Sequence, residues 1–337
     1  MATIGTLVTL ADLARRSDSS GKITSIVELL NLTNEILDDM HFVEGNLPVG
    51  HLTTVRTGLP SATWRLLNYG VQPSKSTTKQ VVDTCGMLEA YAEVDKKLAD
   101  LNGNTAEFRL SEDRAFLEAM NKEMATTLFY GDTSVNPEKF VGLKPRYTTL
   151  SSAGDKTLTS FNVVDGGSAK TATSQTSIWV VVWGPNTVHG IVPKGTTAGF
   201  QHQDLGEVTL LDAASGKFQG YRTHYKWDIG LAVRDWRYAV RIANIEPLNA
   251  TASVATVGDI TKSLVKAFNK IPSMSMGTPV IYCNQEVLTI LEIHVADKTN
   301  TYLTWQQGAD RGAKVLSFRG VPIRRCDALL NTEAVVS

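Results

Sequence analysis

The stretch from Pro48 to Val82 contains no acidic residue, although the chain holds 34 Asp and Glu residues among its 337. Its formal charge of +4 comes from four cations, Arg56, Arg65, Lys75 and Lys79. The segments on either side, residues 1–47 and 89–123, each carry a net charge of −4. Because opposite charges on one kind of molecule attract between identical copies, this pattern favours self-association.

The composition is that of an ordinary soluble globular protein, with 42% hydrophobic and 20% charged residues. A formal net charge of −1 gives no global attraction to nucleic acid or to an anionic membrane. No apolar run approaches the ~18 residues that a membrane span needs. Within residues 1–16 the positive charges come after the apolar stretch, whereas a secretory signal has them before it. Three widely spaced cysteines predict buried free thiols in a reducing cytoplasm: Cys85, Cys283 and Cys326.

The acid-free stretch is predicted to be a long hairpin. Residues 51–57 and 77–92 favour two extended limbs, separated by the turn-forming residues Gly58, Pro60, Gly70 and Pro73. Trp64 and Leu66 are the main apolar residues between the limbs. Because so few apolar side chains cannot build a core of their own, we expect the hairpin to pack on another surface.

Two helices are predicted in the first half of the chain. Ser25 and Glu28 form a capping box that predicts a helix from Ile26 to Asp39. A second helix is predicted over about 111–130, with Ser111 as its cap and Gly131 as its terminator. Its length of ~30 Å suits the backbone of a domain. Its apolar stripe consists of Phe116, Leu117, Met120, Met124 and Leu128.

The second half of the chain predicts a mixture of strands and helices. Residues 148–176 are rich in Ser, Thr, Gly and Ala and predict a loop-rich insert. Residues 219–245 are too long for one ordinary strand, and the parity of their apolar residues changes near Arg234, which indicates a bulge or bend. The fold class is α+β, because the elements show no βαβα regularity. Further strands are expected at 178–183, 188–192, 208–211, 279–283, 315–318 and 321–325, and helices at 256–270 and 285–295.

No motif supports catalysis or a cofactor. Residues 190–197 resemble a phosphate-binding loop, but Thr196 stands where that motif needs a lysine, so a β-turn is the better interpretation. A hydrolase that uses His202 and Asp204 with a cysteine nucleophile is one alternative, but no nucleophile elbow or metal-binding spacing occurs. A nucleic-acid-binding module, with Trp64 and Tyr69 stacking on bases, is the other alternative.

Several short strings carry a resemblance to a known family. They are Glu44-Gly-Asn-Leu-Pro48, Arg56-Thr-Gly-Leu-Pro60, Phe129-Tyr-Gly-Asp132, Asp235-Trp-Arg-Tyr238 and Arg241-Ile-Ala-Asn244. With the order of the predicted parts, they make the chain similar to the major capsid proteins of tailed bacteriophages with the Hong Kong 97-type fold, and to podovirus members in particular. The hairpin at Gly320-Val-Pro322 comes late in the chain, which implies a rearranged order of segments.

The resemblance implies a division of the chain into six parts. They are an N-terminal arm with a helix (1–47), an extended loop or E-loop (48–92), a peripheral domain with a spine helix (93–147), an insert and sheet (148–218), long peripheral-domain strands (219–250) and an axial-domain α/β segment (251–337). The implied function is a non-enzymatic capsid protein that assembles as hexamers and pentamers into an icosahedral shell around phage DNA.

The resemblance also implies partners and a location. Besides other copies of the chain, the expected partners are a separate scaffolding protein, a portal, a decoration or cement protein, and double-stranded DNA bound without sequence specificity. The protein would be made in the cytoplasm of a bacterial host and end in the virion, with no cofactor and no membrane. The predicted subunit-interface residues are Arg56, Trp64, Arg65, Leu66, Lys75 and Lys79.

Overall fold

The computed structural model describes residues 34–101, 105–151, 158–167, 174–196, 199–212, 214–246, 254–296, 303–307 and 314–337. The helix predicted from Ile26 to Asp39 lies mostly outside these residues, as does its capping box. Its last turn is present as helix α2 (Ile36–Asp39). No helix in the described ranges is long and apolar enough to cross a membrane.

One mixed sheet of thirteen strands organises the described part of the chain, and its main path runs β11-β12-β13-β10-β5-β6-β8-β3-β2. Off this path, β1 pairs with β6, β4 with β9, β9 with β5, and β7 with β8. The bounds are β1 (Phe42–Glu44), β2 (Gly50–Gly58), β3 (Thr77–Asp95), β4 (Val163–Asp165), β5 (Thr176–Trp183), β6 (Val188–Val192), β7 (Gln201–Leu211), β8 (Lys217–Val233), β9 (Ala239–Ile245), β10 (Thr278–Cys283), β11 (Leu303–Gln307), β12 (Lys314–Phe318) and β13 (Val321–Arg325).

Most of these strands confirm the prediction from sequence. The hairpin of β12 and β13 turns through Arg319 and Gly320, whose φ angles of 52° and 82° are those of a tight two-residue turn. Strand β7 begins seven residues before the predicted Val208. Strands β1, β4 and β11 were not predicted, and β4 lies in the stretch that was predicted as a loop-rich insert. The remaining helices are α3 (Lys96–Ala99), α4 (Thr105–Tyr130), α6 (Val254–Lys270) and α7 (Gln285–Ala296), with short 3₁₀ turns η2 (Lys144–Arg146), η3 (Thr159–Asn162), η4 (Trp236–Tyr238) and η5 (Met274–Met276).

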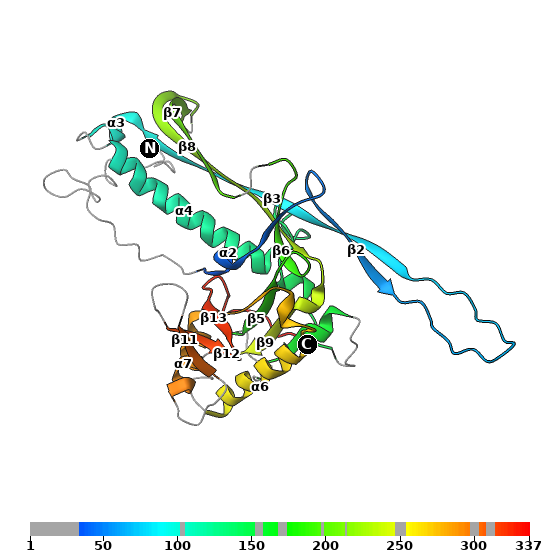
Figure 1. Cartoon of the computed structure of the whole chain (residues 1–337). Helices are drawn as coiled ribbons and strands as arrows, with labels where there is room; N and C mark the ends of the chain where they lie inside the picture. The colour runs from blue at the N-terminus through cyan, green and yellow to red at the C-terminus, as the bar shows by residue number, and fades with distance from the viewer. Residues whose placement is uncertain are drawn as a thin grey trace.

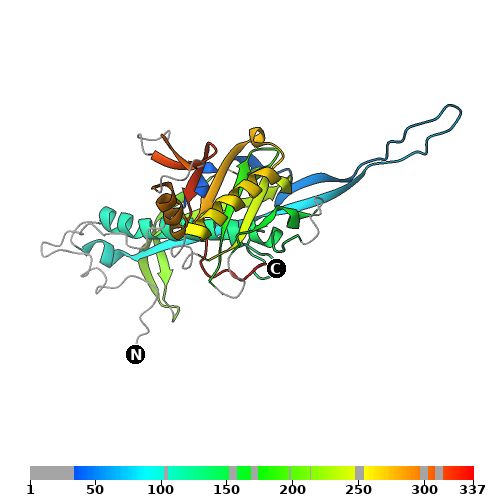
Figure 2. The same ribbon diagram turned by 90° about the horizontal axis from the view of Figure 1, so that it is seen from below.

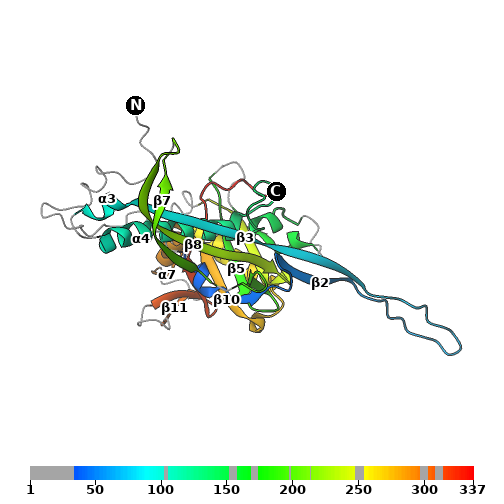
Figure 3. The same ribbon diagram turned by 90° about the horizontal axis from the view of Figure 1, so that it is seen from above.

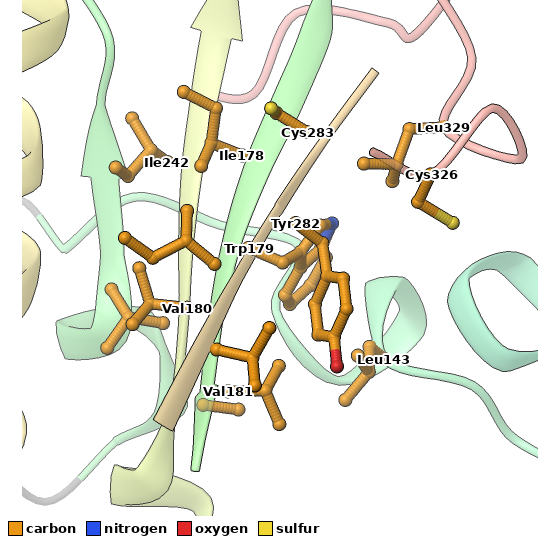
Figure 4. Close-up of a cluster of buried hydrophobic side chains, with 14 of the residues drawn as sticks. Leu143, Ile178, Trp179, Val180, Val181, Ile242, Tyr282, Cys283, Cys326 and Leu329 are labelled. Carbon is orange, nitrogen blue, oxygen red and sulfur yellow. The ribbon is translucent and has the colours of Figure 1, made fainter. Parts of the chain in front are cut away.

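The hydrophobic core centres on β5, whose eight residues are all buried. This strand lies between β9 and β10 and is antiparallel to both. A strand covered on both faces is an unbroken apolar run, as residues 178–183 are. Trp179 and Tyr282 lie side by side in this core (Figure 4). The ring centroid of Phe129 lies 6.2 Å from that of Trp179 and 6.3 Å from that of Tyr282. Helices α6 and α7 pack beside the sheet (Figure 1).

Helix α4 is longer than predicted, with 26 residues and a length of about 39 Å. The predicted start at Ser111 is wrong because the helix continues towards the N-terminus to a second small core. There Phe108 is buried with Val94, Leu98 and Ala99. The first turns of α4 therefore gain apolar burial that a capping pattern in the sequence does not show.

The other features of α4 agree with the prediction except at one position. Met120, Met124 and Leu128 are buried, but Leu117 is 40% exposed and lies outside the stripe. The helix ends at Tyr130, next to the predicted terminator Gly131. A Cβ at that glycine would lie 2.3 Å from the Phe140 carbonyl oxygen, so the close approach of the next segment requires glycine.

The predicted break in residues 219–245 is confirmed, as a turn between two strands rather than a bulge within one. Strand β8 ends at Val233, the 3₁₀ turn η4 follows, and β9 begins at Ala239. Asp235 caps this turn by accepting a 3.0 Å hydrogen bond from the Arg237 N–H. The two strands have different partners, because β8 pairs with β3, β6 and β7 whereas β9 pairs with β4 and β5.

A buried ion pair ties the C-terminal segment to the core. Glu333 is 2% exposed and accepts a 2.8 Å hydrogen bond from the Arg241 guanidinium. The Tyr130 and Ser177 hydroxyls also donate to its carboxylate. The same arginine donates to the Tyr147 carbonyl oxygen at 2.8 Å, so the pair is well hydrogen-bonded on both sides. Segments from four distant parts of the chain are therefore joined at one carboxylate.

We predict that Glu333→Ala lowers the free energy of unfolding by about 3–5 kcal/mol, because it leaves the Arg241 cation buried without its partner. Urea unfolding of the unassembled protein measures this change. The exposed Asp38 provides the control, since Asp38→Ala should alter stability by less than about 0.5 kcal/mol. Equal changes in the free energy of unfolding for the two substitutions would show that loss of the buried partner is no more costly than loss of an exposed carboxylate.

Candidate subunit interface

The acid-free stretch forms an arm that leaves the body of the molecule. We use "arm" for residues 50–84 and "arm tip" for residues 59–76. Strands β2 and β3 pair in antiparallel fashion from Gly50 opposite Thr84 to Gly58 opposite Thr77. The arm tip lies beyond the last paired residues, far from every other element in all three views (Figures 1, 2 and 3). The predicted hairpin with two extended limbs is confirmed.

Strand β3 connects the arm to the body as one continuous element. Its nineteen residues span about 60 Å. Residues 77–84 pair with β2, and residues 85–95 pair with β8. In the second half, Leu88, Ala90 and Ala92 pack with Met120 of α4. The arm is therefore held at its base by a strand that is anchored in the sheet and against the long helix.

The string from Glu44 to Pro48 shapes the root of the arm. The Asn46 side chain accepts a 2.7 Å hydrogen bond from the Leu52 N–H and donates a 2.8 Å bond to the Leu52 carbonyl oxygen. It thus replaces a neighbouring strand on the outer edge of β2. Glu44 accepts a hydrogen bond from the Gly195 N–H at 3.0 Å, which ties the same string to the loop after β6.

The first acid after the acid-free stretch is buried at the root. Asp83 is 5% exposed, and its carboxylate lies 2.8 Å from the Arg146 guanidinium. Arg146 also donates to the carbonyl oxygens of Gly142, Val141 and Leu231. This arginine therefore links the arm to the segment after α4 and to β8.

Histidines meet where β2 leaves the body. His189 of β6 is 1% exposed, and its ring lies edge-on to that of His51 of β2, with centroids 5.6 Å apart. Burial, and then the nearby His51, Arg234 and His41, lowers the pKa of His189 to about 4. The imidazole is therefore neutral at physiological pH, and its protonation opposes the packed arrangement at the root.

All six predicted interface residues lie on the arm. Arg56 and Lys79 are on its paired strands, opposite Thr78 and Val55. The Trp64 side chain is fully exposed, at 104% of its reference area, and Leu66 is 73% exposed. Arg65 and Lys75 are exposed on the arm tip. The structure brings these residues together on one projecting element, and their contact with another copy stays a prediction.

The residues weighed for a hydrolase do not form a catalytic group. Asp204 binds Arg109, whose guanidinium lies 2.6 Å away and lowers the pKa of the aspartate, while the His202 ring stacks near Tyr225. Burial raises the pKa of the Cys85 thiol to about 11 and that of Cys326 to about 12, and it also raises the pKa of Cys283. These thiols are therefore protonated and poorly nucleophilic at neutral pH.

The other sequence-level site predictions have simple outcomes. The segment that resembles a phosphate-binding loop contains the expected turn, in which the Thr196 N–H donates to the Pro193 carbonyl oxygen. Of the cysteines, Cys283 and Cys326 are buried as predicted, whereas Cys85 is only half-buried. Within the described ranges, no group of three or more His, Cys, Asp or Glu residues is placed to hold a metal ion.

The strings that carried the family resemblance occupy structural junctions. Tyr130 contacts Glu333, and Arg241 forms the buried ion pair with that glutamate. Asn244 has a left-handed φ of 59° and holds the C-terminus through hydrogen bonds with both backbone groups of Val336. The Trp236 carbonyl oxygen accepts a 2.7 Å hydrogen bond from the Tyr147 hydroxyl. These residues therefore pack and hydrogen-bond distant segments of the chain together.

Comparison with known proteins decides the family. The model of the family "Major capsid protein GP7" matches residues 18–337. This chain belongs to that family. It is a non-enzymatic structural protein that forms the icosahedral capsid shell of a tailed phage, and it is located in the virion. A search of curated proteins found no significant match.

The solved structure of a 37% identical chain supports this assignment. A chain of bacteriophage Epsilon15 is 37% identical, with a TM-score of 0.76, over 100% of this chain and 99% of that one. The mixed α/β fold of this chain is thus that of Hong Kong 97-type capsid proteins. The bacteriophage JBD30 capsid protein gives 8% identity and a TM-score of 0.46 over 90% and 95% of the two chains. An encapsulin from Synechococcus elongatus gives 10% and 0.40 over 70% and 95%.

Sequence reasoning missed the residues that hold the arm at its root. Asn46 lies in a string that was noted only for its resemblance, and nothing in the sequence pairs it with Leu52. Asp83 directly follows the acid-free stretch, but its partner Arg146 is 63 positions away. The pair of His51 and His189 has no local signal either, because it forms only when β2 crosses β6.

We predict that this protein loses stability as the pH falls from about 6.5 to about 4, in part through His189. The folded state holds the pKa of this imidazole at about 4, below its ordinary value of 6.5, so the unfolded chain takes up the proton first. The loss from this one group is roughly 3 kcal/mol and is complete near pH 4.

Urea unfolding at pH 7.5 and 4.5 measures the effect. In His189→Gln the difference in the free energy of unfolding between pH 7.5 and pH 4.5 should shrink, because the titrating group is gone. His202→Gln, at an exposed histidine, is the matched control and should keep the wild-type difference. An unchanged difference in His189→Gln would show that this histidine does not govern the acid response.

Proposed function

We propose that copies of this protein form hexamers and pentamers, which close around double-stranded phage DNA, and that the arm of one copy lies on a neighbouring copy. The observation that carries this proposal is the exposed apolar arm tip. Leu67 is 81% exposed and Trp64 is fully exposed. Monomeric proteins seldom present such side chains together on a projecting element, and clustered exposed apolar groups mark contact surfaces.

The proposed parts follow the resemblance. The arm corresponds to the E-loop, α4 to the spine helix of the peripheral domain, and residues 251–337 to the axial domain. The continuous pairing of β3 with both β2 and β8 supports the first two assignments, because it places the arm and the long helix on one strand. The late position of the β12–β13 hairpin supports a rearranged order of segments.

Charge sets the partner of the arm in this proposal. The arm supplies four cations and no acid before Asp83, whereas α4 and the segments flanking the arm are acidic. An exposed ion pair contributes only ~0–1 kcal/mol, so charge mainly selects register and partner. Burial of the apolar tip supplies most of the stabilisation, at about 25 cal/mol per Å². Weak contacts repeated around a closed shell suffice for assembly and allow errors to be corrected.

The remaining proposed partners rest on the resemblance alone. They are a separate scaffolding protein, a portal and a decoration or cement protein, with synthesis in the bacterial cytoplasm. Packaged DNA is proposed as a partner that the shell encloses without sequence-specific contacts. The net charge of −1 gives the chain no strong general attraction to this DNA.

We predict that Arg56→Glu combined with Arg65→Glu blocks shell formation and leaves the subunit folded. Both cations are exposed, so their reversal changes the surface that meets a neighbour and not the core. Negative-stain electron microscopy and sedimentation velocity detect the shells, and circular dichroism checks the fold.

The matched control for this prediction reverses two exposed cations outside the arm, Lys194 and Lys217. This control has the same net charge as the arm variant and should still assemble. Normal shells from the arm variant would contradict the charge-pairing part of the proposal.

A further inference from the structure

An apolar cavity with carboxylates at its rim lies at the base of the arm, where β3 passes α4. It has a volume of about 210 Å³. Met87 of β3, Met124 of α4 and Phe140 of the following loop supply apolar walls. Glu123, Glu138 and Lys139 are the charged residues of the lining. Met87 is 75% exposed, so this wall of the cavity faces solvent in the single chain.

The charges at the rim are not balanced. Lys139 and Glu123 pair with each other, at 2.5 Å between Nζ and Oε1. Glu138 is exposed and has no ion-pair partner in the part of the chain that the structure describes. The rim therefore offers one carboxylate to a cation from outside, next to an apolar hollow.

The arm tip presents the complementary groups in adjacent positions. Trp64 is followed directly by Arg65, and both side chains are exposed. The tip has a defined shape, because the Ser74 hydroxyl donates to the Ser61 carbonyl oxygen and links the two limbs. Beyond it, Asn68 takes a left-handed φ of 66°, which closes a turn in which the Tyr69 N–H donates to the Leu66 carbonyl oxygen. A preformed tip loses less conformational entropy on binding.

We infer that this cavity receives Trp64 from the arm of a second copy, with Arg65 of that copy paired to Glu138. The inference rests on the proposed arm contact between copies and adds its receiving site. An arm cannot reach the cavity of its own chain, because the continuous β2–β3 ladder carries the tip away from it (Figure 3). Tryptophan and arginine are the residues that most often dominate the energy of an interface, so this pair anchors the arm.

Site-specific cross-linking tests the contact in assembled shells. Full-length protein carrying Thr63→Cys, which keeps Trp64 itself, and Met87→Cys, with Cys85→Ser to remove the neighbouring thiol, is assembled and then oxidised mildly. Because each copy carries both new cysteines, contact between copies should give a ladder of disulfide-linked oligomers on a non-reducing gel. The control pairs Thr63→Cys with Leu110→Cys, an exposed position near the other end of α4.

The outcomes separate the inference from the function on which it rests. A ladder with Met87→Cys but not with Leu110→Cys supports the cavity as the receiving site. Intact shells with no ladder, or with a ladder only in the control, overturn the cavity and leave the capsid function in place. Failure of the unmodified protein to form shells or rings would contradict the proposed assembly and the inference with it.

A charge exchange gives an independent test of the ion pair. Arg65→Glu alone and Glu138→Arg alone should each lower the yield of shells by about tenfold, as expected for loss of an interface anchor. The double variant restores opposite charges between copies and should recover most of the yield. A double variant that assembles no better than the worse single variant would show that the two residues do not meet.

Discussion

The division of β3 between two partners is the constraint on which the rest of this structure depends. Its first half pairs with β2 and its second half with β8, so the strand leaves the sheet without a break and becomes one limb of the arm. An extended hairpin without a core is marginal by itself in water. Here the ladder is extended outward from strands that are already fixed by α4 and by the main core. The arm therefore has a defined direction although it contains no apolar core of its own.

Burial and exposure follow from this arrangement. At the root, Asp83 and Arg146 form a nearly buried pair, and Asn46 satisfies the outer edge of β2 at Leu52. At the tip, the Trp64 side chain is fully exposed. Root residues thus fix where the arm points, and tip residues remain available for a contact that the single chain cannot make. Substitutions at the two ends should have different effects, since root residues act on folding and tip residues, under the proposed arm contact, act on assembly.

The sequence predicted the local features well, because they have local signals. The limbs of the arm, the break near Arg234 and the Arg319–Gly320 turn each follow from alternation, parity or turn chemistry in neighbouring residues. The start of α4 was predicted wrongly because Phe108 packs on residues about ten positions earlier, which no capping pattern reveals. The place of the six predicted interface residues on an extended hairpin could be foreseen, but the cavity beside Glu138 could not. It exists only where β3, α4 and the loop of Phe140 converge.

The absence of acids from the arm has a physical explanation in the β2–β3 register. Arg56 lies opposite Thr78 and Lys79 lies opposite Val55, so neither cation faces a carboxylate across the hairpin. An acid at either opposite position would form a cross-strand pair and neutralise the arm within its own chain. The first acid that does occur, Asp83, is buried and already bound to Arg146. Its charge is therefore used at the root, and the cations along the arm stay unpaired by the hairpin itself. The lack of acids, which looked like a composition anomaly, is therefore what leaves these cations free of cross-strand partners in the hairpin and open to the proposed contact with another copy.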